Sequence, residues 1–160
     1  MNKIFLMTIA MSFTLLNMSK SVFAHEIGNI VIDAPHIRAT IPGTNVTSAY
    51  MSIKNKSDKA VVLTGASSSV SDRIEIHQHV MNKGMMSMRQ VKQLVIKEQD
   101  QVTLQPMGYH LMIFNVKKSL LPEDKITLTL HFAHQNDVVV SIPVQSIKQE
   151  KQAKKQHHHH

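Results

Sequence analysis

Histidine and methionine gather in one short stretch of this chain. Residues 75–90, EIHQHVMNKGMMSMRQ, contain two histidines and four methionines, and a second stretch, GYHLMIF at 108–114, adds His110 and Met112. Imidazole nitrogen and thioether sulfur both bind metals, and neutral, polarisable sulfur is a poor ligand for Mg²⁺ or Ca²⁺ and a good one for Cu(I). The residue types therefore predict a metal site suited to reduced copper.

A predicted β-hairpin brings the first cluster together. Residues 73–80 alternate apolar and polar side chains, which is typical of a strand with one buried face, and His77 falls on the polar face. Gly84 can supply the positive φ of a hairpin loop, so the chain is expected to return with Met86 and Met88 on one face. The hairpin thus brings His77 near these methionines.

The second cluster follows the same rule of alternation. His110 and Met112 share one face of a predicted strand, and the other face carries Tyr109, Leu111 and Ile113. For any single residue the expected role is more ordinary, because methionines fill gaps in cores and histidines decorate surfaces. The clustering favours the metal site, since six of the seven methionines after residue 24 lie between Met81 and Met112.

The first 24 residues have the features of a secretory signal peptide. Lys3 precedes an apolar run at 4–16, and Val22-Phe23-Ala24 forms a small-residue processing site. The apolar run is shorter than the roughly 20 residues that cross a bilayer, so a permanent membrane anchor is the less favoured alternative. We expect the mature chain to begin at His25 and to work outside the cytoplasm.

Composition excludes several classes of site and partner. The chain has no cysteine, which excludes cysteine nucleophiles, thiolate zinc sites and cysteine-ligated blue copper. Part of the net charge of +7 comes from lysines near the two ends, so the charge is weak evidence for an acidic partner. With no Trp and two Tyr the chain offers few aromatic side chains on which bases could stack, and we expect no nucleic-acid partner. An enzyme would need an acid or base beside the metal, and strand alternation places only the carboxylate of Glu75 there, so no enzymatic activity is expected.

From residue 29 onward the chain reads as short β-type segments, such as SAYMSIKN and KITLTLHF, separated by turn-forming pieces such as IPGTN and PEDK. No long helical stripe competes with them, and no break in composition marks a second domain. We predict a single all-β domain over residues 25–147, with the architecture of a Greek-key β-sandwich or barrel. The polar Lys, Gln and His tail at 148–160 is expected to be disordered. The segment LVIKEQD at 94–100 fits either a strand or an irregular connection.

The spacing of the candidate ligands resembles that of a known family. His77 is followed by ten residues and Met88, and Met88 by twenty-one residues and His110-Leu111-Met112. This is similar to the H-x10-M-x21-H-x-M signature of the periplasmic copper chaperones called PCuAC, and the resemblance extends from DAPHIRATIPG to LPEDKITLTLHF. It implies a cupredoxin-like fold and a periplasmic metallochaperone whose ligands for one Cu(I) are His77, Met88, His110 and Met112.

The resemblance also implies partners. The copper would pass to the CuA centre of cytochrome c oxidase, on subunit II, with Sco-type copper proteins as further partners. Two positions depart from the family pattern: His36 stands where members often have Trp, and His79 where they frequently have Met. His79 is either a spare ligand competent for Cu(II) or an exposed strand histidine.

A secondary, histidine-containing site for Cu(II) is a further expectation. His25 at the mature N-terminus could chelate Cu(II) with its imidazole and free amine, or could simply be solvated. The terminal histidines 157–160 are either a natural copper-collecting tail or a purification tag.

Two other functions stay open at this stage. Periplasmic copper buffering for tolerance would use the same ligands as delivery. A metal-free β-sandwich interaction module would make the methionine clustering accidental.

Overall fold

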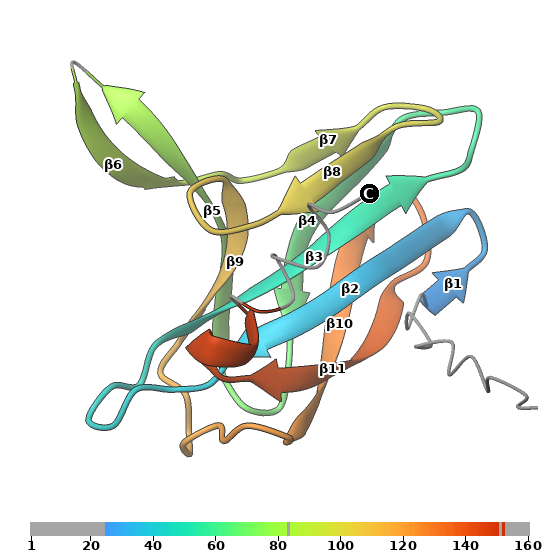
Figure 1. The fold of residues 1–160 in the computed structure, drawn as a ribbon. Helices are drawn as coiled ribbons and strands as arrows, with labels where there is room; N and C mark the ends of the chain where they lie inside the picture. Colours follow the sequence, from blue (N-terminus) through green and yellow to red (C-terminus); the bar gives the residue numbers. More distant parts are fainter. Residues whose placement is uncertain (1–24, 83, 151, 153–160) are drawn as a thin grey trace, which may run out of the picture.

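The computed structural model describes residues 25–82, 84–150 and 152, which mostly form β-strands (Figure 1). The predicted signal peptide and the terminal histidines lie outside the described residues. The strands are β1 His25–Ile27, β2 Ile30–Arg38, β3 Thr47–Asn55, β4 Val61–Ser67, β5 Arg73–Asn82, β6 Met85–Gln90, β7 Leu94–Ile96, β8 Gln101–Leu104, β9 Tyr109–Phe114, β10 Lys125–Ala133 and β11 Val138–Gln145.

The strands form a continuous path of hydrogen-bonded neighbours in the order β6-β5-β9-β8-β3-β2-β11-β10-β4-β7, with β1 paired to β2. Several neighbours, such as β5 and β9, are far apart in sequence, so the connections cross over as a Greek-key arrangement requires. The predicted fold class, an all-β cupredoxin-like sandwich, is confirmed.

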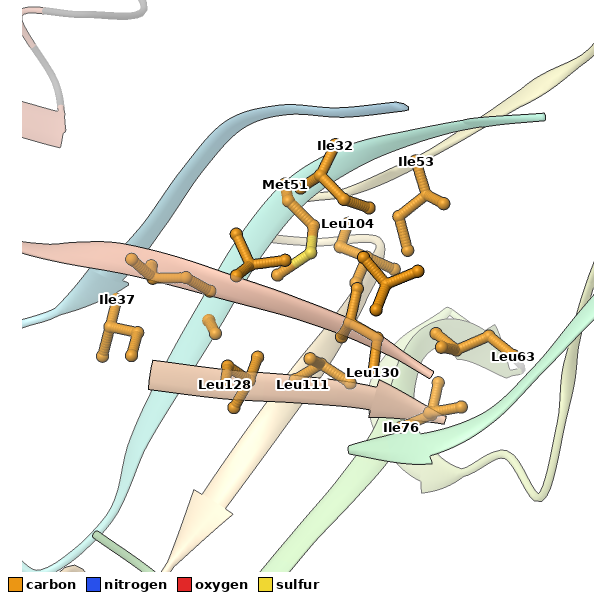
Figure 2. Close-up of a cluster of buried hydrophobic side chains, with 14 of the residues drawn as sticks. Ile32, Ile37, Met51, Ile53, Leu63, Ile76, Leu104, Leu111, Leu128 and Leu130 are labelled. Carbon is orange, nitrogen blue, oxygen red and sulfur yellow. The ribbon is translucent and has the colours of Figure 1, made fainter. Parts of the chain in front are cut away.

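The core is built from alternate residues of nearly every strand. Figure 2 shows the centre of it, where branched aliphatic side chains from different strands converge; fully buried members include Ile32, Ile37, Ile53, Leu63, Leu104 and Leu111. Met51 belongs to this core at 2% exposure, whereas Met81, Met85, Met86 and Met88 are 45–71% exposed. The clustered methionines therefore do not fill core gaps.

The predicted hairpin is present, and it projects from the body of the domain. β5 and β6 extend past the other strands (Figure 1), and β6 pairs with β5 at the end of the strand path. All six residues of β6 are exposed. Gly84 in the turn has φ +78°, the left-handed conformation expected for this glycine.

Two segments whose structure the sequence left open or predicted otherwise are residues 94–100 and 148–150. Residues 94–96 form the short strand β7 beside β4, and the chain then turns at 97–100. The sequence places residues 148–150 in a disordered tail, but 147–150 form a helical turn packed on the domain. Glu150 is 5% exposed there, and its carboxylate accepts hydrogen bonds from Arg38 Nε and Nη2, both at 2.9 Å. This ion pair joins residues that are far apart in sequence, so no local pattern could indicate it.

Candidate metal site

Burial defines which faces of β5 and β9 look away from the core. The core face carries Ile76, Leu111 and Ile113, each at most 2% exposed. Because alternate residues of a strand point to opposite faces, the residues between them lie on the other side of the sheet. We call this side the donor face and define it by His77, His79, Met88, His110 and Met112.

Two candidate ligands are direct cross-strand neighbours at the centre of the donor face. The register of β5 and β9 places His77 opposite His110, and their ring centroids are 6.0 Å apart. The structure thus brings together the two histidines that the sequence predicts as ligands, although thirty-two residues separate them along the chain.

The two candidate thioethers lie on either side of this histidine pair. Met88 pairs with His79, two residues from His77 towards the hairpin tip. Met112 pairs with Glu75, two residues from His77 in the other direction. Two residues of a strand span about 6.6–6.8 Å, a distance that a long, flexible methionine side chain can largely cover. The four predicted ligands therefore occupy three successive rows of one face.

His110 is held in a form that can bind metal. It is 3% exposed, and its Nδ1 lies 3.2 Å from the carbonyl oxygen of Gly108. A carbonyl only accepts, so Nδ1 carries the proton and Nε2 is left with the lone pair. Burial lowers the pKa of His110, an effect that the Gly108 hydrogen bond opposes and the nearby His79 and His77 reinforce. The neutral, ligating form is favoured at neutral pH.

His77 is oriented by a carboxylate. Its Nε2 lies 2.8 Å from Glu75 Oε2, and Glu75 Oε1 accepts a hydrogen bond of 2.7 Å from Arg73 Nε. These two hydrogen bonds, first that from Arg73 and then that from His77, lower the pKa of Glu75. The carboxylate therefore stays ionised and accepts a hydrogen bond from His77 Nε2. His77 Nδ1 is the nitrogen that would hold the lone pair of the neutral ring, and it is buried without a hydrogen-bond partner among the described residues. A carboxylate behind a ligating imidazole is a common second layer of metal sites.

Met112 is positioned from a third strand. Ser48 of β3 pairs with Met112 of β9, and the Ser48 hydroxyl donates to the Met112 sulfur at 3.6 Å. This contact restrains the thioether beside the histidine pair. Sequence reasoning missed Ser48, because only the pairing of β3 with β9, sixty-four residues away, gives it a role.

The donor set fits soft, reduced copper. It offers two imidazoles, each with one nitrogen in a hydrogen bond so that the other is left to hold the lone pair of the neutral ring, and two neutral thioethers. In the described part of the chain no group of three His, Asp or Glu side chains is already arranged to hold a metal ion. A site here would draw on sulfur as well as nitrogen, which favours Cu(I).

The protonation of His110 leads to a prediction about pH. Cu(I) binding requires the neutral imidazole, and burial lowers the pKa of His110. The contribution of His110 to Cu(I) affinity should therefore be lost only below the usual histidine pKa of about 6.5. Chelator competition from pH 8 to pH 5 would measure this loss. A loss already complete by pH 7 would contradict the effect of burial. An affinity that stays constant while the pH falls through the His110 transition of the copper-free protein would exclude ligation by His110.

Comparison with known sequences supports one family. The family model described as "Putative lipoprotein LpqE-like" matches residues 30–144. "Putative lipoprotein Lxx21020" of Leifsonia xyli subsp. xyli (strain CTCB07) is 29% identical over 103 residues, 64% of this chain and 62% of that protein. The match thus spans less than two thirds of the length of this relative.

Several solved structures with the same fold are PCuAC domains, the family that the spacing of the candidate ligands resembles. The copper-bound PCuAC domain from PmoF2 has a TM-score of 0.66 at 22% identity, covering 78% of this chain and 98% of that one. The apo PCuAC domain from PmoF1 has a TM-score of 0.67 at 21% identity, covering 78% and 99%. CuI-DR1885 from Deinococcus radiodurans has a TM-score of 0.59 at 28% identity, covering 69% and 74%.

The similarity in sequence and the similarity in fold agree with each other. The matched range of the family model contains all four predicted ligands, and the resemblance to PCuAC found in the sequence is confirmed. The chain belongs to the LpqE-like family, and its fold is that of the PCuAC domains.

Proposed function

We propose that this protein is a periplasmic copper chaperone that carries one Cu(I) on His77, Met88, His110 and Met112 and delivers it to the CuA centre of cytochrome c oxidase. The observation that carries the proposal is the donor face, where the cross-strand pair of His77 and His110 lies between two thioethers. Copper-bound structures of PCuAC domains with the same fold support the choice of metal.

The site is built for exchange. All four donors are neutral, so no strong charge holds the cation. Met88 belongs to the exposed strand β6 and is itself 45% exposed, whereas His110 is buried in the body of the sheet. A docking acceptor could therefore displace Met88 first while the imidazoles keep the copper. This carrier role needs no acid or base catalyst, and we propose no enzymatic activity.

The proposed location rests on the predicted signal peptide at 1–24. No helix in the described residues is apolar and long enough to cross a membrane. Subunit II of the oxidase, and Sco-type proteins, are the proposed partners.

X-ray absorption of the protein loaded with one equivalent of Cu(I) tests the ligand set. We expect both sulfur and nitrogen neighbours in the first shell, with a stoichiometry of one at the donor face. The physical reason is that soft Cu(I) prefers thioethers where they are available beside imidazole. A shell of nitrogen and oxygen alone would contradict the proposal.

A further inference from the structure

His79 lies between the predicted ligands, although the motif does not include it. Its ring centroid is 5.2 Å from that of His110, closer than the 6.0 Å between His77 and His110. Across the hairpin it pairs with Met88. His79 is therefore not an isolated surface histidine, because its side chain is half-buried and its ring contacts that of His110, a predicted ligand.

One ring nitrogen of His79 has no hydrogen-bond partner among the described residues. His79 Nδ1 is buried and makes no hydrogen bond to any described residue, and the same is true of His77 Nδ1. Buried polar atoms are normally paired, so each unpaired one calls for an explanation. On the donor face both atoms belong to imidazoles that neighbour His110, which suggests that they share one function.

The ring separations agree with ligation of one ion. Two imidazoles bound through nitrogen at about 2.0–2.1 Å have ring centroids roughly 4.5–6.4 Å apart, depending on the angle at the metal. The separations of 5.2 Å and 6.0 Å both fall inside this range. The three histidines do not form a ready ligand cluster in this structure, so side-chain rotation is needed, but the backbone register already suits them.

We infer that His79 is a third imidazole ligand that lets this site hold oxidised copper. In this arrangement Cu(II) is bound by His77, His79 and His110, and the thioethers of Met88 and Met112 are released. Imidazole accepts either oxidation state, whereas thioether favours the softer Cu(I). The inference rests on the proposed function, because both states use His77 and His110. It makes His79 the residue that sets which oxidation states the carrier tolerates.

The experiment compares the full-length mature protein with its His79→Ala and His79→Met variants. Substoichiometric Cu(II) is added without reductant, and paramagnetic broadening of the amide signals of Val80 and Leu111 reports binding at the donor face. Cu(I) affinity is measured separately by chelator competition. Loss of His79 should weaken Cu(II) binding there at least about tenfold and change Cu(I) affinity less than about threefold.

Each variant has a distinct purpose. His79→Met replaces the imidazole by the thioether and should keep Cu(I) while losing Cu(II), which also guards against an effect of misfolding in His79→Ala. His131→Ala is the matched control, since His131 is a histidine of β10 already hydrogen-bonded to Asp137 and Ser67. It should leave the broadening at Val80 and Leu111 unchanged.

The outcomes separate this inference from the proposed function. Unchanged Cu(II) broadening in His79→Ala, or equal loss of both oxidation states in both variants, would overturn the role of His79. Cu(I) binding at the donor face without any Cu(II) broadening in the unmodified protein would also overturn it and leave the chaperone proposal intact. Absence of Cu(I) binding at the donor face would reject the chaperone proposal itself.

Discussion

Replacing His110 with alanine is expected to weaken Cu(I) binding at least about 100-fold, since loss of a partner behind a ligand already costs about 10–100-fold. His110 occupies the centre of the donor face, opposite His77, and Gly108 fixes its tautomer. Without His110, β9 contributes no imidazole to the donor face, and the copper keeps only the imidazoles of β5, His77 and His79. Competition with a Cu(I) chelator measures the loss.

Controls separate ligand loss from structural damage. His110 is buried, so the amide spectrum of His110→Ala must show that the sheet is intact. The thioether side has a matched pair on one strand: Met88→Ala should weaken binding, whereas Met85→Ala, which alters the opposite face of β6, should not. Both side chains are exposed, so each change should alter unfolding free energy by less than about 0.5 kcal/mol. Equal effects of Met85 and Met88 on affinity would count against the proposed ligand set.

Cells that lack this protein are expected to assemble cytochrome c oxidase deficient in its CuA centre when copper is scarce, and added copper should restore the centre. The reason lies in the donor face, which holds a soft cation by neutral ligands beside an exposed hairpin. The measurement is oxidase activity and the CuA signal in membranes of the deletion strain, with and without copper. A gene carrying Met88→Ala and Met112→Ala should fail to complement, and one carrying Met85→Ala should complement fully.

Delivery and buffering give opposite results in this strain. Normal oxidase at limiting copper, together with greater sensitivity to excess copper, would reject delivery and favour storage. Loss of oxidase activity without loss of copper from the CuA centre would point to a role that does not involve the metal, as a β-sandwich interaction module would have.

Much of the donor face was predictable because side-chain direction in a strand is a local property. The alternation around His77 and around His110 depends only on neighbouring residues, and the buried Ile76 and Leu111 confirm it. Gly84 marked the turn for an equally local reason, its tolerance of positive φ. The spacing of His77, Met88, His110 and Met112 along the chain then indicated the PCuAC family. For these features the sequence was sufficient.

Which rows the donors occupy was decided only by the tertiary structure. Register between β5 and β9 placed His110 beside His77 and Met112 beside Glu75, and pairing of β3 with β9 brought in Ser48. The burial of one His79 nitrogen likewise depends on neighbours from other strands. Such contacts join residues tens of positions apart, and they form because the strands share one hydrophobic core. No pattern of nearby residues specifies which distant strand will be the neighbour, so the alternation along β5 determined the face of His79 and the packed sheet determined what His79 meets there.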